Sequence, residues 1–141
     1  MIQKSASATW SGSLKDGGGT ISTGSGALSA APFTFATRFE NGKGTNPEEL
    51  IGAAHAACYA MFLSALMGGA GITPEAIAAT STVTLDPATP GSPTVTRAHL
   101  AVSIRAPAEP ARIEALAAEA KAGCPISKLL KAEITLEVTL G

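Results

Sequence analysis

Apolar and polar residues alternate near the start of the chain, in the pattern of a β-strand. Ala6, Ala8 and Trp10 are separated by serine and threonine, and in a strand such residues lie on one face. A glycine-rich segment at 15–19 then predicts a turn, and residues 20–23 start a return strand. The pattern therefore predicts an antiparallel hairpin.

A second alternating segment, residues 33–39, predicts a further strand. Phe33, Phe35 and Phe39 would share one face of this strand, with Arg38 on the opposite face. An arginine there costs free energy if it is buried without a partner, although a lone arginine is more often solvated. Arg38 is the first candidate for a functional charge.

The most apolar segment predicts a long helix from about residue 45 to Met67. Asn46 can cap this helix and Pro47 suits its first position, while glycines at 68 and 69 end it. The helix is apolar nearly all round, which is typical of a helix buried on every side. Burial on every side is hard to arrange with one sheet and one layer of helices in so small a domain, and a partner subunit is the simplest solution.

The second half of the chain alternates between strand and helix patterns. We expect strands over 81–86, 94–105 and 134–140, a helix over 112–122, and a short helix from Cys124 to about Leu130. The order of runs, βββ-α-ββ-α-β, is that of the α+β class. No linker or repeat divides the chain, so we expect a single domain over residues 1–141.

Composition and charge exclude several classes of protein. The chain carries 10 Lys+Arg against 11 Asp+Glu, without a basic run that would attract nucleic acid. The N-terminus lacks the apolar core of a secretory signal. His55 and Ser64 interrupt the long apolar stretch, which favours a buried core helix over a membrane span. Two cysteines without a signal peptide indicate the cytoplasm, where thiols stay reduced.

The two cysteines are the candidates for chemistry. Cys58 lies in the middle of the long helix, where a free cysteine usually packs as a small, inert apolar side chain. Cys124 precedes Pro125 at the start of a short helix, where backbone N–H groups favour the reactive thiolate, although it can equally be an ordinary cap residue. Two thiols from separate segments suit a peroxide reductase, because a sulfenic acid on one condenses with the other to a disulfide.

A charged pair could support such a thiol. Glu48 lies in the first turn of the Cys58 helix, where it complements the helix dipole. Paired with Arg38, it would also hold a fixed positive charge beside Cys58.

His55 leaves other functions open. It precedes Cys58 by three residues, so both project from nearly the same helix face, and with Cys124 they could form a three-ligand zinc site. No fourth ligand accompanies them, and the spacing is poor for a Cys–His protease dyad, so we favour a hydrogen-bonded packing role for His55. A different class is a non-catalytic dimer that binds a small apolar ligand, which would not need an Arg38–Glu48 pair.

Three segments give the chain a resemblance to a known family. Residues 37–40, 44–58 and 121–127 closely resemble the osmotically inducible protein C and organic hydroperoxide resistance family, nearest to its OsmC branch. The likeness extends from the Trp10 strand to the final strand.

The resemblance implies a fold and an assembly. Members are intertwined homodimers in which antiparallel sheets wrap around two long central helices, and their active sites lie at the subunit interface. It also implies that Cys58 is the peroxidatic cysteine and Cys124 the resolving one. Arg38 matches the residue that stabilises the thiolate and binds the peroxide, and Glu48 the acid that orients that arginine.

The implied activity is that of a thiol-dependent peroxidase acting in oxidative or osmotic stress defence. Organic hydroperoxides, alkyl or lipid, are reduced to alcohols through a sulfenic acid and an intramolecular disulfide, which a dithiol, of the lipoyl type in this family, then reduces. No metal or other cofactor is expected.

Overall fold

The computed structural model describes all 141 residues as two compact units, Met1–Leu50 and Ile51–Gly141. Helix α2 (Pro47–Gly69) begins in the first unit and continues through the second. Helices and two small sheets together confirm the α+β class. One domain over residues 1–141 stays a prediction.

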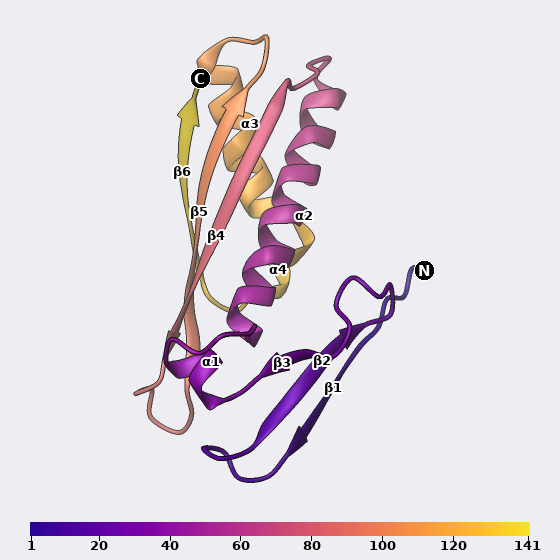
Figure 1. Cartoon of the computed structure of the whole chain (residues 1–141). Helices are drawn as coiled ribbons and strands as arrows, with labels where there is room; N and C mark the ends of the chain where they lie inside the picture. Colours follow the sequence, from indigo (N-terminus) through magenta and orange to yellow (C-terminus); the bar gives the residue numbers. More distant parts are fainter. The chain divides into compact units, whose positions relative to one another are not determined.

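The first unit contains the predicted hairpin, which is confirmed. Strands β1 (Ala6–Ser11), β2 (Gly18–Thr23) and β3 (Ala31–Phe33) form an antiparallel sheet in that order (Figure 1). Gly19 lies between Trp10 and Phe33 in the register, and their rings come to 5.3 Å between centroids. A Cβ on Gly19 would meet the Phe33 ring at 2.7 Å, so the glycine permits this aromatic contact.

The prediction of a strand over residues 33–39 is wrong. Strand β3 ends at Phe33, and the short helix α1 (Phe35–Phe39) follows. Thr34 caps α1, because its hydroxyl accepts a hydrogen bond from the Thr37 N–H while the Thr37 hydroxyl accepts one from the Thr34 N–H. Phenylalanines at 35 and 39 fit a helix as well as a strand, because residues four apart share a helix face.

The second unit contains a sheet of mixed direction. Strands β4 (Ala76–Asp86) and β5 (Thr94–Arg105) are antiparallel, but β6 (Glu133–Leu140) runs parallel to β5. The expectation of purely antiparallel sheets is therefore wrong for this sheet. A parallel pair needs a crossover connection, which helices α3 (Pro110–Gly123) and α4 (Pro125–Leu129) supply.

Helices α2 and α3 cover one face of this sheet (Figure 1). The inward side chains of β5, α2 and α3 form one core, in which Tyr59, Leu63, Leu100, Ala117 and Ala120 are fully buried. The Tyr59 hydroxyl donates a 2.9 Å hydrogen bond to the Ala117 carbonyl. Small side chains in this core let the helices approach the sheet and each other closely.

The opposite face of α2 stays uncovered within one chain. Its exposed side chains are almost all small and apolar, and the largest, Met61, is 77% exposed; this exposed stripe consists of Ala54, Ala57, Met61, Ala65 and Gly68. By length and hydropathy alone, α2 could cross a membrane. It is nevertheless a core helix on its other face, so burial on every side is not reached within one chain.

Gly52 of α2 packs closely against strand β4. A Cβ there would lie 2.8 Å from the Ser81 carbonyl oxygen, whereas a Cβ on Gly69 at the end of the same helix would meet nothing within 4 Å. Gly52→Ala should lower the free energy of unfolding by about 1–3 kcal/mol, measured by urea unfolding. Gly69→Ala is the matched control and should change it by less than about 0.5 kcal/mol. An equal loss of unfolding free energy in Gly52→Ala and Gly69→Ala would contradict the close packing of Gly52 against the sheet.

Candidate active site

Each unit holds one pair of the predicted site residues. In the second unit, the free thiols of Cys58 and Cys124 lie near each other, close enough for Cys124 to affect the pKa of Cys58. In the first unit, Arg38 pairs with Glu48.

Cys124 is held by the end of one helix and the start of the next. Its N–H donates to the Ala120 carbonyl at 3.0 Å, and its carbonyl accepts from Lys128 at 3.0 Å. A Cβ on the preceding Gly123 would lie 2.7 Å from the Phe62 ring of α2, so this glycine lets α2 pack against the turn. Cys124 is fully buried there.

The surroundings of Cys58 favour its neutral thiol. Burial raises the pKa of Cys58, and the hydrogen bond with the Cys124 thiol raises it further. The backbone N–H of Ile126 acts in the opposite direction and lowers it, because a donor to the sulfur stabilises the anion. The net effect is a raised pKa, so the second unit alone does not supply the thiolate that a nucleophile requires.

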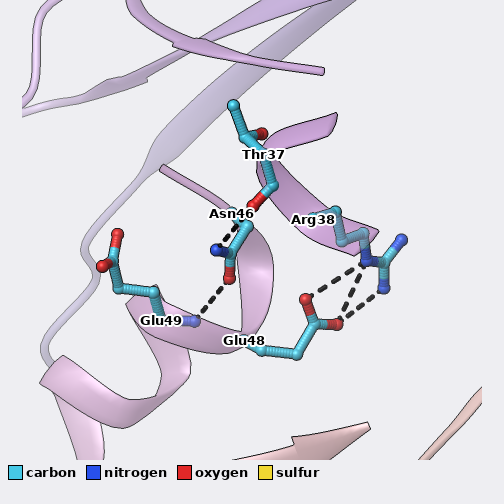
Figure 2. Close-up of polar contacts among 5 residues, drawn as sticks. All are labelled: Thr37, Arg38, Asn46, Glu48 and Glu49. Atoms are coloured by element: carbon cyan, nitrogen blue, oxygen red, sulfur yellow. Dashed lines mark hydrogen bonds and ion pairs between the residues drawn. The ribbon is translucent and has the colours of Figure 1, made fainter. Parts of the chain in front are cut away.

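Arg38 and Glu48 form a bidentate ion pair (Figure 2). The Arg38 Nη2 lies 2.7 Å from Glu48 Oε1, and its Nε lies 3.2 Å from both carboxylate oxygens. The Glu48 side chain is only 12% exposed, against 37% for Arg38. The carboxylate therefore holds the guanidinium from one side, while the second terminal nitrogen of Arg38 makes no hydrogen bond within the chain.

The ion pair is supported by the start of α2. The Asn46 side chain accepts a 2.8 Å hydrogen bond from the Glu49 N–H, which confirms the predicted cap, and donates one of 3.0 Å to the Thr37 carbonyl (Figure 2). Asn46 thus ties α1 to the first turn of α2. This fixes the two elements that carry Arg38 and Glu48.

An apolar hollow of about 300 Å³ adjoins Arg38 in the first unit. Half of its lining residues are aromatic, and Arg38 is the only charged one; the lining residues are Trp10, Leu14, Phe33, Thr34, Phe35, Arg38, Phe39 and Pro47. The Arg38 guanidinium lies 5.4 Å from the centre of the Phe39 ring, within cation–π range. A molecule with an apolar body and a polar end fits this lining.

His55 is fully buried and makes two hydrogen bonds. Its Nδ1 lies 2.8 Å from the Ser81 hydroxyl and its Nε2 lies 2.8 Å from the Ser127 hydroxyl. The hydrogen-bonded packing role predicted for His55 is confirmed. With both nitrogens occupied, the zinc alternative lacks its histidine ligand.

Comparison with known proteins identifies the family. Residues 40–139 match the model of OsmC-like proteins. The chain is 49% identical over 140 residues to the peroxiredoxin OsmC of Escherichia coli K12, covering 99% of this chain and 97% of that protein. The chain belongs to the OsmC family. The peroxiredoxin OsmC of Shigella flexneri gives the same identity and coverage.

Solved structures share the fold at low identity. The organic hydroperoxide resistance protein OhrB of Bacillus subtilis superposes with a TM-score of 0.72 at 23% identity, covering 97% of this chain and 98% of that one. An OsmC-like protein of unknown function from Vibrio cholerae gives 0.75 at 19% identity, covering 99% and 100%. The predicted resemblance to this family is confirmed.

The structure pairs the predicted site residues two by two, Cys58 with Cys124 and Arg38 with Glu48. Sequence reasoning missed the partners of His55. The available signal was the spacing of Ser127, three residues after Cys124, which equals the spacing of His55 and Cys58. Nothing in the sequence indicated a role for the Ile126 N–H, since every residue but proline carries a backbone N–H.

His55 makes stability depend on pH. Burial lowers the pKa of His55 from its ordinary value of 6.5, so the unfolded chain takes up a proton at a higher pH than the folded chain. The free energy of unfolding therefore keeps its full value above about pH 6.5. It falls as the pH falls towards the pKa of His55 in the folded chain, by at most about 1.4 kcal/mol per pH unit.

Urea unfolding between about pH 7.5 and 5.5 measures this loss. His55→Gln should remove it, whereas His99→Gln, which replaces the only other histidine, should retain it. The same slope in wild type and His55→Gln would contradict the assignment to His55.

Proposed function

We propose that this chain is a thiol-dependent peroxidase that reduces organic hydroperoxides, with Cys58 as the attacking thiol and Cys124 as the resolving thiol. The observation that carries the proposal is the proximity of two free thiols from separate segments of the second unit. The peroxiredoxin OsmC relatives at 49% identity support it.

The cycle needs no metal or other cofactor. The Cys58 thiolate attacks one peroxide oxygen, the O–O bond breaks, and the alkoxide takes a proton and leaves as an alcohol. Cys58 is then a sulfenic acid. The Cys124 sulfur attacks it, a disulfide forms and water leaves. Thiol–disulfide exchange with a dithiol restores both thiols; a lipoyl-type dithiol is the reductant we propose from the family resemblance.

Arg38 supplies the charge that the second unit lacks. Because burial and Cys124 raise the pKa of Cys58, a permanent cation near its sulfur is needed to stabilise the thiolate. Arginine stays protonated and presents a planar set of donors that can hold a thiolate and a peroxide together. Glu48 orients it, and the second terminal nitrogen stays free for the substrate.

We propose a homodimer with active sites at the subunit interface. Ten positions of α2 separate Glu48 from Cys58, about 15 Å along a helix axis, so the Glu48 carboxylate does not reach the sulfur on its own helix. The exposed stripe of α2 is apolar and lacks a cover within one chain. A second copy of α2 would bury it and bring its own Arg38 to Cys58.

The substrate class follows from the hollow beside Arg38. Its aromatic lining favours an alkyl or lipid hydroperoxide over hydrogen peroxide, because each buried methylene contributes about 0.8 kcal/mol. Both thiols must be reduced at the start of each cycle, so we place the protein in the cytoplasm.

Intact mass spectrometry after one equivalent of an alkyl hydroperoxide tests the two thiols. Wild type should become lighter by about 2 Da as the disulfide forms, whereas Cys124→Ser should stop at the sulfenic acid and gain about 32 Da as sulfinic acid in excess peroxide. Cys58→Ser should show neither change. A Cys124→Ser protein that resists sulfinic acid as well as wild type would contradict the resolving role.

Mixed dimers test where Arg38 acts. Arg38→Ala alone should shift Cys58 alkylation to higher pH by about 1–3 units and lose most turnover. Refolding it together with Cys58→Ser should restore about a quarter of wild-type activity, because half of the random dimers then contain one complete site. No recovery on mixing would place Arg38 and Cys58 of the active site in the same chain.

A further inference from the structure

His55 is a buried titratable side chain that the proposed cycle does not use. It lies one turn before Cys58 on α2, and its ring joins two other elements, strand β4 through Ser81 and helix α4 through Ser127. Both bonds are 2.8 Å long. A neutral imidazole can accept from one hydroxyl and donate to the other, and the lowered pKa of His55 agrees with a neutral ring.

Helix α4 depends on other elements for its position. It has five residues, and a helix so short is not stable by itself. The 2.8 Å hydrogen bond between Ser127 and His55 joins α4 to α2, and the Ile126 N–H of α4 acts on Cys58 of the same helix. The bond between Ser127 and His55 therefore helps to fix where the segment that begins with Cys124 lies on α2.

The residues that face each other on α2 and at the start of α4 have the same spacing. His55 and Cys58 are three residues apart on α2, and Cys124 and Ser127 are three residues apart at the start of α4. His55 bonds to Ser127, while Cys58 lies near Cys124. Because the spacings are equal, the imidazole–hydroxyl bond sets the alignment of the two sulfurs.

We infer that His55, through Ser127, is a positioning residue that holds Cys124 in line for attack on the oxidised Cys58. The inference rests on the proposed peroxidase cycle and concerns one step of it. In that step the Cys124 sulfur bonds to the Cys58 sulfur, the S–O bond of the sulfenic acid breaks, and water leaves. A sulfur displaced by about 1 Å can lose up to about a hundredfold in rate.

Two serine variants separate positioning from stability. Ser127→Ala and Ser81→Ala each remove one 2.8 Å hydroxyl bond to His55, but only the first releases α4. Quenched-flow mass spectrometry with an alkyl hydroperoxide follows sulfenic acid and disulfide separately. Disulfide closure is unimolecular, so its rate does not depend on peroxide concentration, unlike the oxidation of Cys58.

Closure should be about tenfold slower in Ser127→Ala, which should also form sulfinic acid at peroxide concentrations that leave wild type and Ser81→Ala as disulfides. Closure at the wild-type rate in Ser127→Ala would overturn the inference, as would equal slowing in Ser81→Ala, which would mean a general loss of rigidity. If wild type itself forms neither sulfenic acid nor disulfide, the proposed function fails instead.

Discussion

The packing of α2 against the turn between α3 and α4 is the contact on which the thiol chemistry depends. Cys58 is on a long helix and Cys124 is in a turn far along the chain, and neither is placed by its own neighbours in sequence. Gly123 lets the Phe62 ring lie against the turn, and Tyr59 bonds to the α3 backbone at Ala117. These close contacts bring the two thiols near each other.

The same packing leaves the Cys58 thiolate without sufficient stabilisation. Burial and the neighbouring thiol raise the pKa of Cys58, so the arrangement that prepares a disulfide also disfavours the nucleophile. The Arg38–Glu48 pair belongs to the other unit and is held by the Asn46 cap of α2. In the proposed cycle, the first unit supplies the cation and the second unit supplies both thiols.

Local sequence patterns gave a wrong prediction where the same residue spacing fits two kinds of structure. Phenylalanines at 33, 35 and 39 alternate as in a strand, but Phe35 and Phe39 also lie one helical turn apart, and the capping box of Thr34 and Thr37 decides for a helix. Direction within the sheet is a second case. The alternation along β6 fits a strand of either direction, and the crossover through α3 and α4 makes it parallel to β5.

The sequence by itself determined the α+β class, the long helix with its Asn46 cap, the strand over Thr94–Arg105 and the family, because these follow from periodicity, capping and motifs that act over a few residues. Tertiary structure decided which distant groups touch. His55 meets Ser127, Cys58 meets Cys124, and the Ile126 N–H points at a sulfur, because contacts between α2 and α4 depend on the packing of both on one core. No pattern within either segment carries that information.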